Sequence, residues 1–324
     1  MPHGAEKTSH PPMGVELHLH LEGALTAARA QSLHQIATGV PAFPEGGIVS
    51  GDSGVEWAFE DLGGFLRLFG WATQLLRGPR EYGLLLRDLL ASLRAQEIQY
   101  AEIFVAIGQM HRADIDPAKV LPELSRIARE SHDAGGPRIG FIADATRQWG
   151  VAACDRVLDT ALQLQEFDIV GFGVGGDERA LRARELKAVY RRAAAAELGL
   201  SCHAGEGSSA DAVREVVEEL GVRRVGHGIA AAADSRLMRE LAEEDVLLEI
   251  CPTSNRLTGA WREGDHPMLR LHAAGVPLCL GSDDPAFFGC TLESECALVR
   301  EWGLGDQDMD AFRQNAWRHT FSQS

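Results

Sequence analysis

Residues 15–20 read Val-Glu-Leu-His-Leu-His, a short apolar run that carries two histidines near its end. Side chains on a β-strand point alternately to its two faces, so a strand here would place the imidazoles of His18 and His20 on one side. Seven more apolar runs of strand length follow along the chain. The eight predicted strands are residues 15–20, 98–107, 138–144, 168–174, 200–203, 223–227, 246–251 and 276–280.

Helical spacing of apolar residues recurs between these strands. It is clearest in residues 79–96, 116–132, 179–198 and 235–244. Alternating strands and helices are typical of α/β proteins with a parallel sheet. Eight such units in a chain of 324 residues favour a closed (β/α)8 barrel, the TIM barrel, over an open doubly wound sheet. In a barrel, His18 and His20 would point into the interior.

The connection between the first two predicted strands is unusually long. Its glycines are Gly46, Gly47, Gly51 and Gly54, and its apolar stripe consists of Leu62, Phe65, Leu66 and Phe69. Long loops after barrel strands usually serve the active-site face, so we expect a helical insertion there. The stripe is equally compatible with the buried side of an ordinary helix.

The first 14 residues are rich in Pro, His, Gly and Ser and lack apolar periodicity, so we predict a flexible lead-in over residues 1–14. Residues 15–324 are predicted to form a single barrel domain. The six cysteines are scattered without a CxxC pair, and the N-terminus lacks an apolar signal segment. Both features favour reduced thiols and a cytoplasmic location.

The composition narrows the class of partner. The net charge of −16 repels phosphate backbones and argues against nucleic acid. No apolar run approaches the roughly 20 residues that span a bilayer, so no membrane partner is expected. We expect a small-molecule partner, and the sequence assigns no oligomeric state.

Further ionisable residues stand at the ends of later predicted strands, where barrel active sites are built. They are His203, His227, Asp283 and Asp284. A His-x-His pair alone is more often structural than metal-binding, but this coincidence of residue type and position reverses that interpretation. Three histidines and a carboxylate can hold one zinc ion and leave room for a water molecule, whose pKa a catalytic zinc lowers to about 7.

Glu206 follows His203 by three residues on the same strand exit. Attack of hydroxide on an aromatic amidine carbon requires a carboxyl group that delivers a proton to the ring nitrogen and then to the leaving ammonia. Glu206 is placed for this task. Alternatively, it is the first-turn acid of a helix over residues 208–220, where the helix dipole favours a carboxylate.

Two other metal chemistries fit the sequence less well. Binuclear barrel hydrolases commonly bridge their metals through a modified lysine on the fourth strand. Residues 168–174 contain no lysine, so one metal is expected. Cytidine deaminases combine H-x-E with P-C-x-x-C. His20-Leu-Glu22 matches the first half, but the chain has no PCxxC.

Six motifs, in this order, make the chain similar to the adenosine deaminase family of the amidohydrolase superfamily. They are Glu16-Leu-His-Leu-His-Leu-Glu-Gly-Ala, Gly176-Asp-Glu, His203-Ala-Gly-Glu, Gly226-His-Gly, Cys251-Pro-Thr-Ser-Asn and Ser282-Asp-Asp-Pro. The resemblance runs from about Val15 to the C-terminus. It implies a purine aminohydrolase that replaces the 6-amino group of an adenine ring with oxygen, with one zinc ion per chain as cofactor.

The resemblance also implies a role for each candidate residue. The zinc ligands would be His18, His20, His203 and Asp283. Glu206 would carry a proton to ring N1, and His227 would orient the hydroxide. Asp284 would hold ring N7, and the backbone N–H of Gly176 would hold ring N3. The stripe of Leu62, Phe65, Leu66 and Phe69 is similar to the family's hydrophobic gate helix.

The positions that bear on substrate point in different directions. Glu22 stands where adenosine deaminases typically have the Asp that meets the ribose 5′-hydroxyl; adenine deaminases have Glu there. Gly173-Val-Gly-Gly-Asp-Glu is similar to the nucleoside deaminase pattern. Glu22 also suits aminodeoxyfutalosine, a nucleoside with an altered 5′ end. We predict deamination of a purine nucleoside, either adenosine or a 5′-modified adenosine such as aminodeoxyfutalosine, with deamination of free adenine as the alternative.

Two alternatives belong to other classes. A barrel that binds purines without turnover is disfavoured by the intact set of metal-binding and proton-transferring candidates. A metal-dependent hydrolase of another amide, such as a cyclic imide, is disfavoured because Gly176 and Asp284 suit the two acceptor nitrogens of an adenine edge.

Overall fold

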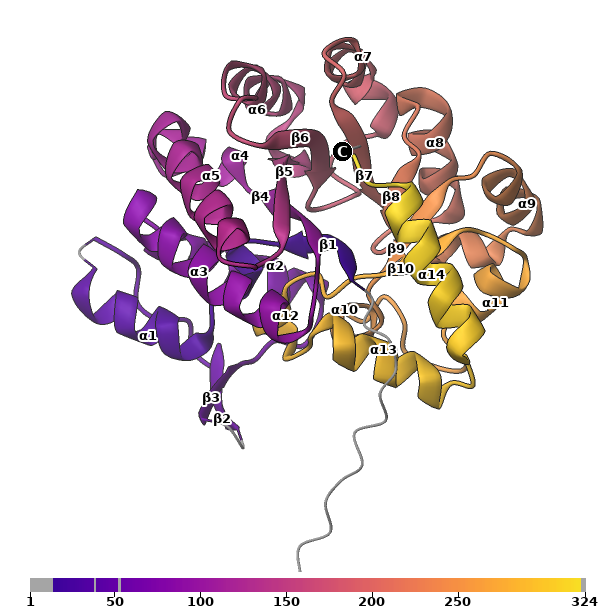
Figure 1. Ribbon diagram of the computed structural model, residues 1–324, viewed down its shortest axis with the longest axis horizontal. Helices are drawn as coiled ribbons and strands as arrows, with labels where there is room; N and C mark the ends of the chain where they lie inside the picture. Colours follow the sequence, from indigo (N-terminus) through magenta and orange to yellow (C-terminus); the bar gives the residue numbers. More distant parts are fainter. Residues whose placement is uncertain (1–13, 38, 52–53, 322–324) are drawn as a thin grey trace, which may run out of the picture.

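A sheet of eight parallel strands forms the centre of the computed structural model, which describes residues 14–37, 39–51 and 54–321. Neighbouring strands follow the order β1-β4-β5-β6-β7-β8-β9-β10, and helices surround them (Figure 1). The strands are β1 (Val15–His20), β4 (Tyr100–Val105), β5 (Arg138–Thr146), β6 (Ile169–Gly175), β7 (Gly199–Ala204), β8 (Arg224–His227), β9 (Leu247–Ile250) and β10 (Leu278–Leu280).

The sheet closes where β1 meets the segment that follows β10. The N–H of His20 donates to the carbonyl oxygen of Asp283 at 2.8 Å, and the N–H of Asp283 donates to that of His18 at 2.9 Å. The predicted TIM barrel is therefore confirmed. All eight predicted strands are present, with boundaries within two residues of those observed, because runs that are buried on both faces of a parallel sheet are continuously apolar.

Helices cover the outside of the barrel. They are α3 (Pro79–Ala95), α5 (Pro117–Asp133), α6 (Val151–Gln163), α7 (Lys187–Ala195), α8 (Ala210–Leu220), α9 (Ser235–Glu243), α13 (Leu292–Glu301) and α14 (Asp306–Arg318). Shorter helices lie in the connections: α4 (Ile107–Arg112), α10 (Pro252–Leu257), α11 (Met268–Ala273) and α12 (Pro285–Phe288). Three of the four predicted helices agree with α3, α5 and α9 to within one residue.

The helix predicted over residues 179–198 is wrong at both ends. The first helical turn is a 3-10 turn at Ala183–Leu186, and α7 ends at Ala195. Side chains hold the preceding backbone in another shape, since Asp177 accepts the N–H of Arg179 and Glu185 accepts the N–H of Arg182, each at 3.0 Å. Such side-chain bonds compete with helix formation.

The long insertion after β1 contains α1 (Ala27–Ile36), the antiparallel hairpin of β2 (Ile48–Gly51) and β3 (Gly54–Trp57), and α2 (Leu62–Ala72). Its glycine-rich part thus forms a hairpin that the sequence did not predict. The indole N–H of Trp57 donates to the carbonyl oxygen of Leu25 at 2.7 Å, and its ring stacks on Phe287 with centroids 4.7 Å apart. The first contact ties the hairpin to the start of the insertion, and the second ties it to α12, which follows the last barrel strand.

The interior of the barrel contains a buried charge, Arg224 of β8, whose residue is 1% exposed. Its Nε donates to Glu249 at 2.5 Å, and its Nη atoms donate to Glu102 and to the carbonyl oxygen of Leu17, the latter at 3.0 Å. The guanidinium also lies 3.8 Å from the ring centroid of Phe321. A buried charge is stable only when it has partners. The partners of Arg224 come from three other strands, so the network links four strands of the barrel.

Three sequence predictions concern features away from the barrel. The lead-in predicted for residues 1–14 lies outside the described residues except for Gly14, whose carbonyl accepts the N–H of Gln99 at 2.7 Å. All six cysteines are free. In the part of the chain that the structure describes, no helix has the length and apolar character needed to cross a membrane.

Candidate active site

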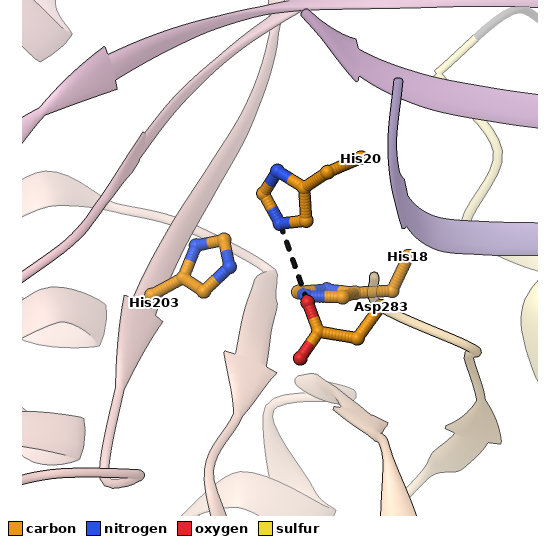
Figure 2. Close-up of side chains that lie close together, drawn as sticks. All are labelled: His18, His20, His203 and Asp283. Atoms are coloured by element: carbon orange, nitrogen blue, oxygen red, sulfur yellow. Dashed lines mark ion pairs between the residues drawn. The ribbon is translucent and has the colours of Figure 1, made fainter. Parts of the chain in front are cut away.

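The four predicted metal ligands come together inside the barrel. They are His18, His20, His203 and Asp283, each with a ligand atom within 4.8 Å of those of the others. Figure 2 shows the three imidazoles and the carboxylate gathered around one space. The Nε2 atoms of His20 and His18 lie 3.5 and 3.7 Å from Oδ1 of Asp283.

The backbone explains how residues from three strands meet. Alternation along β1 turns His18 and His20 inward, and β7 brings His203 to the same level. Asp283 has a φ of 61°, the left-handed region that a non-glycine residue rarely adopts. Such a conformation costs roughly 1–3 kcal/mol and is typical of functional sites, and here the hydrogen bonds that close the barrel hold it.

The hydrogen bonding of His18 fits a metal ligand. Its Nδ1 lies 2.6 Å from Oε2 of Glu249, while its buried Nε2, which faces the other three ligands, has no hydrogen-bond partner among the described residues. Metal-binding histidines usually donate the second ring N–H to a carboxylate, which fixes the tautomer and the ring. Nitrogen and oxygen donors of this kind suit zinc. The residues present therefore fit a divalent metal.

The charge states of the ligands favour metal binding. Burial lowers the pKa of His20 to about 4 and that of His203 well below its usual value, so both imidazoles are neutral, as a metal ligand must be. Burial would also lower the pKa of His18, but Asp283 and Glu249 outweigh it and raise the pKa to about 10. A metal ion at His18 must therefore displace a proton.

Glu249 is an anion that orients His18. Burial would raise the pKa of Glu249, but Arg224 and His18 together lower it to about 2. The sequence analysis did not single out this glutamate, because it lies 231 residues from His18 and no local pattern marks it. A second group of possible ligands, His227, Cys251 and Asp283, shares Asp283 with the first and so is not an independent site.

Glu206 and His227 lie beside the metal ligands. Oε2 of Glu206 is 3.6 Å from Nε2 of His227, and Oε1 accepts the hydroxyl of Thr258 at 3.0 Å. Burial raises the pKa of Glu206, as a group that exchanges protons near neutral pH requires. The first-turn acid of α8 is Asp211, and Glu206 precedes that helix, so the helix-dipole interpretation of Glu206 is wrong.

Two residues that the sequence analysis did not assign hold these groups in place. The side-chain amide of Asn255 lies 3.1 Å from Nδ1 of His227 and donates to it, which leaves the ring proton on Nε2, facing Glu206. The carboxylate of Glu178 accepts the N–H groups of Gly205 and Glu206 at 2.7 and 3.0 Å. Both lie in motifs already quoted, Cys251-Pro-Thr-Ser-Asn and Gly176-Asp-Glu, which were the available signal.

Asp284 and Gly176 face a small cavity next to the metal ligands. The cavity has a volume of about 90 Å³, and its other walls include His20, Ala106, Gln109, Asp144, Thr146, Gln148, Gly175, His203, Glu206, His227 and Asp283. Burial and the charge of Asp283 raise the pKa of Asp284 well above its usual value, so it can donate a hydrogen bond. Gly176 has a φ of 91°, and a Cβ there would lie 2.3 Å from Oε1 of Gln148.

The apolar stripe of α2 forms one wall of this cavity. It consists of Leu62, Phe65, Leu66 and Phe69. Phe65 is buried and packs on Phe287 and Phe288, with ring centroids 5.7 and 5.0 Å away. The stripe is thus partly core and partly cavity wall.

Glu22 does not line the cavity, although it is buried, with 1% exposure. Its Oε1 accepts the N–H of Ala106 at 3.0 Å, and its Oε2 has no hydrogen-bond partner in residues 14–37, 39–51 and 54–321. Ala106 is the N-cap of α4, so Glu22 fixes the start of a helix that is distant in sequence. Asp144, which the sequence analysis did not select, does line the cavity, and its position at the end of a predicted strand was the signal that could have found it.

The adenosine deaminase family model matches residues 13–324. The chain belongs to the adenosine deaminase family. The relatives of this deaminase include an adenine deaminase from Chelativorans sp. (strain BNC1), 31% identical over 94% of this chain and 93% of the relative. An aminodeoxyfutalosine deaminase from Acidothermus cellulolyticus is 32% identical over 92% of this chain and 86% of the relative. The crystal structure of adenine deaminase from Arthrobacter aurescens superimposes with a TM-score of 0.86 and 26% identity over 96% of this chain and 94% of that one.

Replacing Glu249 tests how His18 is held. Glu249→Gln removes the anion that orients His18, so zinc affinity should fall roughly 10- to 100-fold, as for other carboxylates behind a metal-binding histidine. Competition with a chelating dye measures this change. Glu244→Gln is the control, since Glu244 pairs with Arg223 at the surface and should bind zinc like the unmodified protein. An unchanged affinity in Glu249→Gln would contradict the role assigned to it.

The adjacent aspartates should differ in their effect on the metal. Asp283→Ala removes one of four converging ligand atoms and should lose most of the bound zinc, whereas Asp284→Ala should keep about one zinc per chain and lose purine binding. Elemental analysis of the purified variants measures both. Equal zinc loss in the two variants, or two metals per chain in the unmodified protein, would disprove this division.

Proposed function

We propose that this protein hydrolyses the C6–amino bond of free adenine, giving hypoxanthine and ammonia. The observation that carries the proposal is the cavity of about 90 Å³ beside the metal ligands, into which Glu206, Asp284 and Asp144 project. Carboxyl groups on the walls of a small cavity suit a flat ligand whose edge carries several hydrogen-bonding nitrogens, as a purine does.

One zinc ion per chain is the proposed cofactor, held by His18, His20, His203 and Asp283. When bound, zinc supplies Lewis acidity that makes water a nucleophile at neutral pH. The fit of the donor atoms and the presence of a single independent group of ligands among the described residues support this assignment.

Glu206 is proposed to move the protons of the reaction. Addition of water at C6 forms a C6–O bond and shifts an electron pair onto N1, where a proton from Glu206 neutralises it. The carboxylate takes one proton from the water and passes it to the amino group. The C6–N bond then breaks, ammonia leaves, and the remaining hydroxyl proton returns to Glu206 as the C6–O double bond forms. The raised pKa of Glu206 suits a carboxyl that both gives and takes a proton, and His227, 3.6 Å away, is placed to orient the attacking water.

The purine is proposed to bind through its ring nitrogens. Protonated Asp284 donates to N7, and the N–H of Gly176 donates to N3, while the apolar stripe of α2 covers the ring. Closure and opening of α2 as a gate is part of the proposal, because this helix supplies one whole side of the cavity.

The size of the cavity favours the base over a nucleoside. Sites for larger ligands measure about 300–1,000 Å³, well above this one. Two proteins similar to this chain are adenine deaminases: the relative from Chelativorans and the crystallised protein from Arthrobacter aurescens. The sequence favoured a nucleoside, and that reaction is the second candidate, because a hollow of about 390 Å³ adjoins the cavity through Leu66, Gln109 and Gln148. A ribose with a modified 5′ end would enter this hollow.

Ammonia release from three purines tests the substrate. With free adenine as the substrate, kcat/KM for adenine should exceed that for adenosine and for aminodeoxyfutalosine by at least tenfold. A higher kcat/KM for either nucleoside would establish the second candidate instead, and no ammonia from any of the three would refute the proposed reaction.

Glu206→Gln tests the proton transfer separately from metal binding. The amide keeps the shape of the side chain but cannot exchange the proton, so kcat should fall by roughly 10²–10⁴-fold. Zinc content should stay near that of the unmodified protein, since Glu206 is not among the metal ligands. Turnover at the unmodified rate would remove Glu206 from the mechanism.

A further inference from the structure

Asp144 is a buried carboxyl group that the proposed reaction does not use. It lies near the carboxyl end of β5 with 7% exposure. Its Oδ1 is buried and has no hydrogen-bond partner within the described part of the chain. An unpaired buried carboxyl oxygen is unfavourable unless a ligand supplies the missing bond. Because Asp144 also lines the cavity, the missing partner is expected on the substrate.

The neighbours of Asp144 show which part of the substrate it would meet. In the pairing of β5 with β6, Asp144 lies opposite Gly173, and Thr146 lies opposite Gly175. Gly175 and Gly176 line the same cavity, and neither has a side chain to fill the space. Asp144 thus lies on the strand beside β6, whose carboxyl end leads to Gly176, the residue assigned to ring N3, and both residues line one cavity.

The order of atoms in a purine completes this placement. With N1 at Glu206, N3 at Gly176 and N7 at Asp284, the remaining nitrogen is N9, which lies between N3 and N7 on the far side of the ring from N1. In free adenine N9 carries a proton, whereas in every nucleoside it carries the sugar carbon. A carboxyl group keeps at least one oxygen that can accept a hydrogen bond, whether it is ionised or protonated.

We propose that Oδ1 of Asp144 accepts the N9–H of free adenine and thereby selects the base over N9-substituted purines. The inference rests on the proposed function and names the residue that sets its substrate. A purine substituted at N9 leaves Asp144 unpaired and places carbon against a buried oxygen. Sites built to bond a donor discriminate strongly against ligands that lack it.

The test compares adenine with 9-methyladenine, which differs only at N9. The unmodified enzyme should show a kcat/KM for adenine at least tenfold above that for 9-methyladenine. Asp144→Leu keeps the bulk of the side chain and removes its oxygens. In this variant kcat/KM for adenine should fall roughly 10- to 150-fold, as expected for loss of one such bond, while that for 9-methyladenine changes less than threefold.

Controls separate this role from a structural one. Zinc content and the melting temperature of Asp144→Leu should match those of the unmodified enzyme, and Asp155→Leu, the same change at an exposed position on α6, should leave both substrates unaffected. Equal losses for the two substrates in a variant that retains zinc would overturn the proposal. A selective loss of adenosine turnover would also overturn it and assign Asp144 to a ribose hydroxyl.

Two further results test the proposal even if Asp144→Leu is not informative. If Asp144→Leu does not fold, the unmodified enzyme still decides, because turnover of 9-methyladenine within threefold of adenine contradicts the proposal. Absence of adenine turnover in the unmodified enzyme would instead refute the proposed function. This result is distinguishable from adenine turnover that is unchanged in Asp144→Leu, which would refute only the role of Asp144.

Discussion

The proposed metal site depends on one shared carboxylate. Glu249 bonds Nδ1 of His18 through one oxygen and Nε of Arg224 through the other. The arginine is satisfied in turn by Glu102 and by the backbone of β1. Since a buried ion is stable only when all of its partners are in place, the orientation of a metal ligand is set by the packing of the whole barrel interior. Any change that loosens this network would therefore alter the position of His18 in the proposed metal site.

Beside this network of ion pairs, the barrel interior holds buried groups whose pKa values are shifted by burial. The imidazoles of His20 and His203, near the ends of β1 and β7, are neutral because burial lowers their pKa. Beyond them, burial raises the pKa of Glu206 and Asp284. One physical cause, removal from water, therefore gives opposite results for imidazole and carboxyl groups, and both results suit the chemistry. Burial of these side chains inside the barrel is therefore enough to shift their pKa values in the required directions.

The sequence predicted the features that depend on local order. Alternation placed His18 and His20 on one face, and strand ends identified His203, His227 and Asp283, because strand position alone brings such residues to one end of a barrel. It did not predict Glu249, since that role depends on a partner far along the chain. The β2–β3 hairpin was also missed, because its strands have only four residues each and are largely exposed, so the alternation along β3 is too short to be recognised. Asp144 was passed over because a lone carboxyl at a strand end becomes informative only when its empty bond is visible.

The position of Asp283 has a consequence for folding. This residue closes the barrel by pairing with the backbone of β1, and its carboxylate lies with His18 and His20 of β1 in the proposed metal site. The first and last strands are thus joined twice, once by peptide hydrogen bonds and once through the ion that their side chains can share. Metal bound only by the closed form stabilises it by mass action. The ion would hold the first and last strands together. A chain whose final strand had not yet docked could not retain the ion, so metal uptake would report that the barrel had closed.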